Sequence, residues 1–327
     1  MNNTKRALII SVVVSLLLVL LIVLVDPLVS DRVLAPDTGA SHYYWKLPTR
    51  NNFNQVIVWL LFLIHLSGNY YLIRKRLKVK ERDFTIENTN LLVFNVIMIL
   101  IHFVQSIIGY DGLAQDVSVF SSQYSVIFML VTIILMEIPR RGIIFGKKIK
   151  IDKNIMKFLY AIHGFVFTFS IVYTFWYHPV INTIGHLFGF FYMFLLFTQL
   201  SFVKTKIHTN PKWIVSLEVL VAFHGASVAY YVQNSSLWSM FLFGFGFIFV
   251  FTQIYGLALK KMQIYAIQLI FIICAVGYYL ITDISNVHQI LWIPIVEYGH
   301  VVVMLIIAFG INKIIKNRKT RRVNENV

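Results

Sequence analysis

Histidine is the residue type whose spacing in this chain most clearly suggests chemistry. His102, His163 and His224 follow one another at intervals of 61 residues, each within an apolar run, in the segments LIHF, AIHG and AFHG. An imidazole can ligate haem iron or another transition metal, and it can carry a proton near neutral pH. A fixed period is typical of repeated units that hold a site where they meet. The three histidines therefore predict a redox or proton-handling site.

Two further histidines, His65 and His300, are expected at a similar depth, because helices rise about 1.5 Å per residue. Five imidazoles would then share one layer in the middle of a membrane. Such a layer predicts a b-type haem clamped by two histidines, or a pocket in which a quinol loses protons as its electrons leave. Glu218 and His186 are further candidates for this pocket. The alternative is that each histidine only bridges two helices by hydrogen bonds.

Other kinds of site are poorly supported. The only cysteine is Cys274, which excludes an internal disulfide, a cysteine-based zinc or iron–sulfur site and a c-type haem attachment sequence. The sequence also lacks the HExxH pattern of zinc proteases and the GxSxG pattern of serine hydrolases. Any metal would therefore depend on histidine and carboxylate ligands.

The elements that position these residues are expected to be membrane-spanning helices. Hydrophobic residues make up 58% of the 327 residues and the mean hydropathy is +0.74, well above the values of soluble domains. Runs of about 20 apolar residues, enough to cross the hydrocarbon core, occur ten times. We predict an all-α polytopic protein, a single integral membrane domain over 1–327, with spans near 7–29, 54–73, 90–110, 120–138, 155–177, 183–203, 213–232, 237–259, 262–282 and 290–312.

The basic residues predict the orientation. Of the 29 Lys and Arg residues, all but Arg32, Lys46 and Arg50 fall in the connections that would share one side of the membrane with both termini. Since cytoplasmic loops are enriched in Lys and Arg, both termini are predicted inside and the chain forms five hairpins. The basic tail at 313–327 would attract anionic lipids, and it does not indicate nucleic-acid binding. The largest outer loop, 30–53, carries aromatic residues expected to anchor at the interface.

The first apolar run resembles a signal peptide, with a basic start at Lys5 and Arg6. However, Ala7 to Val25 contains no charged residue, and this run is longer than the 7–15 residues of a signal core. We therefore expect an uncleaved first span.

A second match supports internal repetition. The segments FLLFTQLSFVK at 194–204 and FVFTQIYGLALK at 249–260 close the hairpins that begin with His163 and His224. The third and fourth hairpins are therefore predicted to be copies of one 61-residue unit, with the second hairpin more diverged. The repeated glutamines, Gln199 and Gln253, are expected to form hydrogen bonds between helices.

Mid-membrane histidines on consecutive hairpins resemble integral electron carriers of the cytochrome b and ferric-reductase kind. Among these, LIHF, AIHG and AFHG resemble the membrane components of the flavin-based extracellular electron-transfer chain of Gram-positive bacteria. The resemblance implies electron flow from demethylmenaquinol, in the plasma membrane, to an extracytoplasmic flavoprotein through other membrane redox proteins. In cytochrome b folds two ligand histidines lie about 13–14 residues apart on one helix, whereas His163 and His178 are 15 apart. A single haem or a quinone site is therefore expected rather than two stacked haems.

Two other functions fit ten spans. A polytopic acyl- or glycosyltransferase of the cell envelope could use a histidine as general base. A proton-coupled transporter or lipid flippase could use histidines as coupling groups. The outer loops lack clustered Arg, Asp and His for a transferase. Spans broken by proline would favour a transporter, but the prolines inside predicted spans, Pro27 and Pro294, lie near span ends.

Overall fold

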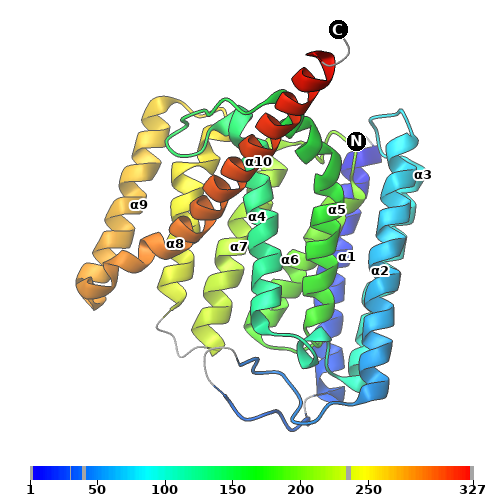
Figure 1. Ribbon diagram of the computed structural model, residues 1–327. Coiled ribbons are helices and arrows are strands. Elements are labelled where there is room, and N and C mark those ends of the chain that lie inside the picture. The colour runs from blue at the N-terminus through cyan, green and yellow to red at the C-terminus, as the bar shows by residue number, and fades with distance from the viewer. Residues whose placement is uncertain (1–2, 30, 39–41, 233–236, 325–327) are drawn as a thin grey trace. The chain divides into compact units, whose positions relative to one another are not determined.

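The computed structural model describes residues 3–29, 31–38, 42–232 and 237–324 (Figure 1). Within these residues the regular structure is entirely helical, and ten helices are long and apolar enough to cross a membrane, as predicted. The α-helices are α1 (Asn3–Val25), α2 (Asn52–Lys78), α3 (Ile86–Gly109), α4 (Val119–Arg141), α5 (Lys153–Tyr177), α6 (Ile184–Ser201), α7 (Pro211–Val232), α8 (Trp238–Phe251), α9 (Lys261–Thr282) and α10 (Trp292–Asn324).

Polar residues mark several of the helix starts. The side chain of Asn51 accepts a hydrogen bond from the backbone N–H of Asn54 at 3.0 Å and caps α2. Thr85 and Asn88 form a capping box at the start of α3. Thr183 accepts from the N–H of His186 at the start of α6. These caps satisfy backbone donors that the first helical turn leaves unpaired.

Four short 3-10 segments follow or precede these helices. They are η1 (Asp26–Leu28), η2 (Leu113–Gln115), η3 (Gln253–Gly256) and η4 (Ile284–Leu291). The predicted span 237–259 ends as an α-helix already at Phe251, and the predicted basic tail continues α10 as far as Asn324. Residues 325–327 of that tail, and residues 30 and 39–41 of the predicted outer loop, lie outside the described residues.

The chain divides into two compact units that are interleaved in sequence. Unit 1 is drawn from residues 1–128 and 164–242, and unit 2 from residues 129–163 and 243–327. In unit 1, α6 packs against α7 and α1, α2 packs against α3, and α3 also contacts α6. In unit 2, η4 packs against α9 and α10 around a small core that includes Tyr279 and Ile290. The sequence did not predict this division.

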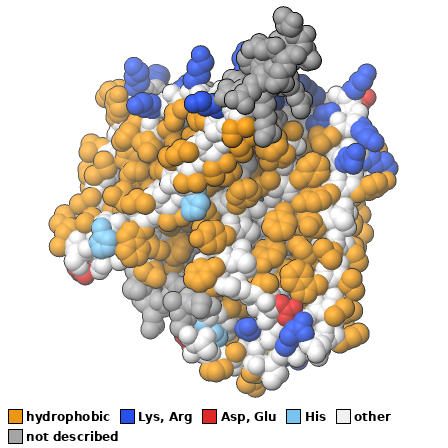
Figure 2. All heavy atoms as spheres, viewed as in Figure 1, with side chains coloured by type: hydrophobic (Ala, Val, Ile, Leu, Met, Phe, Trp, Pro, Cys, Tyr) orange, Lys and Arg blue, Asp and Glu red, His pale blue; other side chains and the backbone are white. Residues whose placement is uncertain are grey.

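The surface has the character expected for contact with lipid. Figure 2 shows hydrophobic side chains along the flanks of the helices that face the viewer and Lys and Arg side chains where helices end. The first helix is typical, because large apolar residues such as Ile10, Leu17 and Leu24 are more than half exposed. Exposed apolar flanks of spanning length are stable in a bilayer and costly in water.

Candidate functional site

Two of the predicted histidines meet within unit 1, around the indole of Trp176. His65 lies near the middle of α2, His102 lies in the last third of α3, and Trp176 lies in the last turn of α5. All three side chains are fully buried. Trp176 Nε1 donates a hydrogen bond to His65 Nδ1 at 3.0 Å, and the rings of Trp176 and His102 are 4.6 Å apart between centroids.

The contacts of His65 fix where its proton lies. Because an indole N–H can only donate, His65 Nδ1 must accept, and the ring proton is therefore on Nε2. That nitrogen lies 2.8 Å from Oδ1 of Asn95, which also accepts from Nδ2 of Asn69 at 2.9 Å. Phe197 stacks on the imidazole at 5.0 Å between ring centroids. His65 is thus a neutral imidazole held from all sides.

The polar contacts continue from Asn95 toward the end of α2 that carries Arg76. Asn95 Nδ2 donates to Ser201 Oγ at 3.2 Å, and Asn88 Nδ2 donates to the Ser201 carbonyl at 2.7 Å. Arg76 Nε donates to Asn88 Oδ1 at 2.7 Å, and its other nitrogens donate to backbone carbonyls between α2 and α3. The buried guanidinium is therefore fully partnered, as a charge at this depth requires.

His102 lies between two carbonyl oxygens. Its Nδ1 is 3.0 Å from Gln105 Oε1, and its Nε2 is 2.8 Å from the backbone oxygen of His178. Gln105 is oriented by its amide nitrogen, which donates to the Asp111 carbonyl at 2.8 Å and to Asn54 at 3.3 Å. A neutral imidazole has one N–H and a protonated one has two. The neutral ring can therefore donate to only one of these oxygens at a time, whereas the protonated ring can donate to both.

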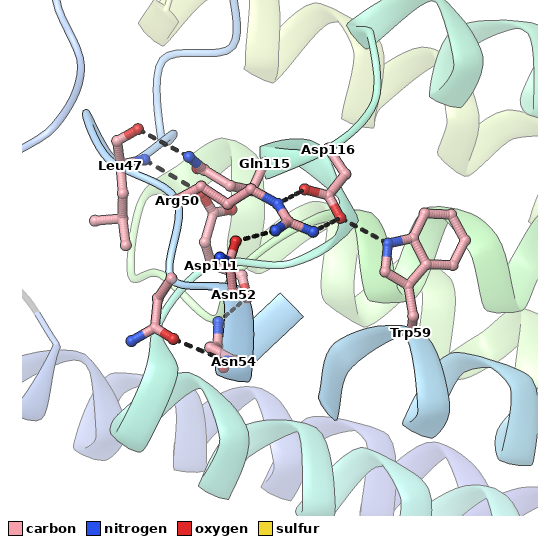
Figure 3. Close-up of polar contacts among 9 residues, drawn as sticks. Leu47, Arg50, Asn52, Asn54, Trp59, Asp111, Gln115 and Asp116 are labelled. Atoms are coloured by element: carbon pink, nitrogen blue, oxygen red, sulfur yellow. Dashed lines mark hydrogen bonds and ion pairs between the residues drawn. The ribbon is translucent and has the colours of Figure 1, made fainter. Parts of the chain in front are cut away.

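Beyond Gln105, the polar contacts reach the connection between α3 and α4, drawn in Figure 3. The carboxylate of Asp111 accepts hydrogen bonds from the backbone N–H groups of Leu47 at 3.2 Å and Gly112 at 2.8 Å. Asp111 is fully buried, and this burial raises the pKa of its carboxyl group to about 7 despite those two bonds. A group with this pKa exchanges protons at neutral pH.

Asp116 fixes the neighbouring part of the same connection (Figure 3). Its carboxylate accepts from Arg50 Nε at 2.6 Å and from Trp59 Nε1 at 2.8 Å. The Arg50 guanidinium holds the pKa of Asp116 below its ordinary value. Gln115 donates to the Leu47 carbonyl at 3.3 Å, so the segment before α2 is held on both sides of Leu47.

That segment brings aromatic residues against two more histidines. The Tyr43 hydroxyl is 2.6 Å from His178 Nδ1, and the rings of Trp45 and His186 are 4.1 Å apart between centroids. Burial, together with the nearby His224 and His102, lowers the pKa of His178 to about 3. His178 is therefore neutral at physiological pH. Tyr43 and Trp45 thus contact His178 and His186. From the sequence, the aromatic residues of this loop were expected to anchor the protein at the membrane interface.

His224 packs against α6. Its ring forms a hydrogen bond to the backbone of Gly185, and a Cβ placed on Gly189 would lie 2.7 Å from its Cε1 atom. Its Nδ1 is buried and has no hydrogen-bond partner among the described residues. The glycines on α6 thus make room for this imidazole between helices.

The remaining predicted residues lie elsewhere. His163 and His300 belong to unit 2, where their Nδ1 atoms are 2.7 Å from the backbone oxygens of Tyr160 and Val296. Glu218 is buried on α7 in unit 1. The structure thus brings His65 together with His102, and His224 together with His178 and His186. A single site built by all five predicted histidines stays a prediction.

The repeated glutamines have different surroundings. Gln199 Oε1 accepts from Trp213 Nε1 at 2.8 Å, which joins α6 to α7 as expected. Gln253 lies after the end of α8, and its Oε1 is buried with no partner among the described residues. The FTQ segment therefore lies within α6 but continues past the end of α8.

The contacts of His65 and His102 do not fit haem ligation. An axial ligand needs a ring nitrogen with a lone pair directed at iron, and each nitrogen of both rings already has a polar protein atom within 2.8 to 3.0 Å. Nor do three His, Cys, Asp or Glu side chains of the described chain lie close enough to hold a metal ion.

An apolar groove of about 420 Å³ opens beside His65. It runs between α1, α3 and α6, and its wall includes Ser15, Asn95 and Phe197. Asn95 and Phe197 are the residues that contact His65 directly. The amide oxygen of Asn69, next to Asn95, is buried with no hydrogen-bond partner in the described part of the chain. A single layer of side chains, which includes Asn95 and Phe197, therefore separates the groove from His65.

Asn69, Asn95, Gln105 and Trp176 were missed as site residues. A signal for them was present, because Asn88, Asn95 and His102 are spaced by seven residues along α3. Two helical turns separate such positions, so they lie on one face. A polar residue repeated at this spacing in an apolar helix indicates a buried polar face rather than a lone histidine.

No protein-family model, curated protein or solved structure matches this chain.

Proposed function

We propose that this protein is a bacterial plasma-membrane redox component that passes electrons from a lipid-soluble quinol toward an extracytoplasmic acceptor. The observation that carries the proposal is the groove on α1, α3 and α6, whose wall residue Asn95 is hydrogen-bonded to the buried His65. A ligand that reaches this groove from the bilayer must be apolar. A quinol fits because it joins an apolar chain to two hydroxyl groups.

The polar groups behind the groove suit a quinol head group. The unpartnered oxygen of Asn69 would accept a hydrogen bond from a quinol hydroxyl after a small displacement of Asn95 or Phe197. Oxidation of a quinol releases two protons and two electrons. His102 can hold a proton without losing a hydrogen bond, and Asp111 has a pKa of about 7. These two residues would accept protons on the side of the predicted outer loop.

The wider assignment follows the resemblance to the flavin-based extracellular electron-transfer chain. The distribution of basic residues favours both termini in the cytoplasm, the segment around Tyr43 outside, and anionic lipids at the basic tail. Demethylmenaquinone is the candidate quinone, and an extracytoplasmic flavoprotein is the candidate acceptor, reached through other membrane redox proteins. Because His65 and His102 do not fit haem ligation, a quinol site is preferred to a haem in unit 1.

The proposal is tested in a strain that lacks the gene and carries either the wild-type gene or a His65→Gln variant. Quinol-dependent reduction of a membrane-impermeant ferric acceptor is measured at equal protein levels. The wild-type gene should restore reduction, and the variant should lose at least about tenfold, because about 1.4 kcal/mol of transition-state stabilisation corresponds to tenfold in rate. His288→Ala, at an exposed position of η4, is the matched control. Reduction that does not depend on the gene would overturn the proposal.

Proton-coupled transport is the second candidate. One run of hydrogen bonds extends from Arg76 to His65, and a second run extends from His102 to the Asp111 carbonyl. In this column of residues the indole of Trp176 lies between the two runs, with a hydrogen bond to His65 and a ring contact to His102. Such a column could carry protons in place of electrons. Proton flux into vesicles without any redox substrate would favour transport, and its absence together with quinol oxidation would favour the redox function.

A further inference from the structure

A carboxyl group in unit 2 has no role in the quinol site. Glu297 lies in the second turn of α10 and is only 2% exposed. It belongs to a buried stripe with Pro294, Val301 and Leu305, spaced by three and four residues. Positions spaced in this way share one face of a helix. Glu297 is thus an acidic residue in an otherwise apolar buried stripe.

The surroundings of Glu297 offer little compensation for a negative charge. Its Oε2 atom is buried without a hydrogen-bond partner among the described residues. The two ion pairs recorded in the described chain involve Asp116 and Glu137. A carboxylate buried without a cation or hydrogen-bond donors costs several kcal/mol or more, so such groups in membranes are typically functional.

The titratable and charged groups near this turn are few. Tyr298 and His300 lie on α10 itself. Arg141, at the end of α4, interacts electrostatically with Tyr298. The Tyr298 hydroxyl is 2.6 Å from Thr252 Oγ1, which follows α8. This pair of hydroxyl groups is therefore formed by the residue that follows Glu297 on α10.

We propose that Glu297 is a proton-binding site within the membrane, loaded and unloaded as the protein works. Loading adds one proton to the carboxylate and unloading returns it, with no electron transferred. A metal cation is a poorer fit, because hard cations take about six or more oxygen ligands. Among the described residues, no three His, Cys, Asp or Glu side chains lie close enough together to hold a metal ion. The inference goes beyond the quinol function and does not depend on it.

The test uses the full chain in lipid vesicles treated with the apolar reagent dicyclohexylcarbodiimide. This reagent reacts with a protonated carboxyl, whose proton moves to a carbodiimide nitrogen while the carboxylate oxygen bonds to the carbodiimide carbon. The adduct rearranges to a stable N-acylurea, which peptide mass spectrometry locates. We expect modification at Glu297 at pH 6 that slows as the pH is raised, is unaffected by sodium ions and is absent in Glu297→Gln.

Glu137 is the matched internal control, because it also lies on a spanning helix but pairs with Arg140 at 2.5 Å. It should remain unmodified by the apolar reagent. Modification of Glu297 does not require the variant to fold, because the wild-type protein alone reports it. An unmodified Glu297 at pH 6, or protection by sodium ions without any effect of pH, would overturn the proposal.

Discussion

At the scale of single residues, unit 1 is organised by amide side chains as much as by histidines. Asn95 satisfies His65, Asn69 and Ser201 at once, through three hydrogen bonds of 2.8 to 3.2 Å. Gln105 has the same role for His102 and the Asp111 carbonyl. An amide can donate and accept at the same time, so each amide links one imidazole to further polar groups.

The first prediction concerns Asn95. Replacing it in Asn95→Leu leaves N–H groups of His65 and Asn69 buried without partners. Each unpaired donor is expected to lower the free energy of unfolding by about 1–3 kcal/mol. Thermal unfolding in detergent measures the loss, with Val104→Leu as the control because Val104 is an exposed residue on the same helix. Equal melting temperatures for Asn95→Leu and the control would contradict the role given to Asn95.

The second prediction concerns the pH dependence of stability. Burial raises the pKa of Asp111 to about 7, above its ordinary value of 3.8, so the folded protein binds this proton more tightly than the unfolded chain. The contribution of this group to stability is therefore fully present below about pH 4 and is lost as the pH rises through 7. Asp111→Asn should remove that decline in the melting temperature between pH 4 and 7.

Asp116→Asn provides the contrasting control for this measurement. Arg50 lowers the pKa of Asp116, so its contribution is lost as the pH falls below its ordinary value. This variant should flatten the acid side of the profile and leave the range from pH 4 to 7 unchanged. The assignment of Asp111 fails if its variant keeps the wild-type slope in that range.

At the scale of elements, α6 and α7 are joined at two glycines. Cβ atoms on Gly185 and Gly189 would lie 3.0 Å from Val228 and 2.7 Å from His224, so both positions require glycine for close packing. This geometry gives His224 a place between helices and a backbone hydrogen bond to Gly185. Gly164, which follows His163 in the sequence, has open space around it instead.

The third prediction compares these glycines. Gly189→Ala should push the His224 ring away from α6 and lower the free energy of unfolding by about 1–3 kcal/mol, the usual cost of overpacking. Gly164→Ala should be neutral or stabilise α5 by up to about 1 kcal/mol, because alanine favours the helix. Unfolding in detergent measures both variants. A destabilised Gly164→Ala with an unaffected Gly189→Ala would contradict the packing described for α6 and α7.

The sequence predicted the ten spans because their length and apolar character depend on local composition alone. It also singled out His65 and His102, which the structure buries against Trp176. It did not predict the partners, because contacts such as Trp176 with His65 join residues 111 positions apart in the chain. The same reason explains why His163 and His224 have different neighbours although they lie in the similar segments AIHG and AFHG. A repeated pattern predicts similar helices, but not similar neighbours.

At the scale of the whole molecule, the account requires a definite orientation in the membrane. All but three of the 29 basic residues lie in connections assigned to one side. The electrostatic preference of these residues for the cytoplasm would put Arg50 and Asp116 outside. Quinol electrons could then leave on the side of Tyr43 and Asp111.

The fourth prediction tests this orientation. In a Cys274→Ser background, Ser118→Cys should react with a membrane-impermeant maleimide in intact cells, because Ser118 is exposed between α3 and α4. Lys150→Cys, exposed between α4 and α5, should react only after the cells are made permeable. Reaction at position 150 in intact cells would reverse the topology.

The central claim is that the groove beside Asn95 receives a quinol. The most direct measurement is the titration of the purified protein in lipid nanodiscs with a menaquinol analogue, comparing wild type with Ser15→Phe. Ser15 is buried in the groove wall, so the phenyl ring of the variant should fill part of the groove. The account predicts saturable binding near one quinol per chain and at least a tenfold weaker affinity in the variant, a difference of about 1.4 kcal/mol. Equal affinities, or no saturable binding to the wild type, would contradict it.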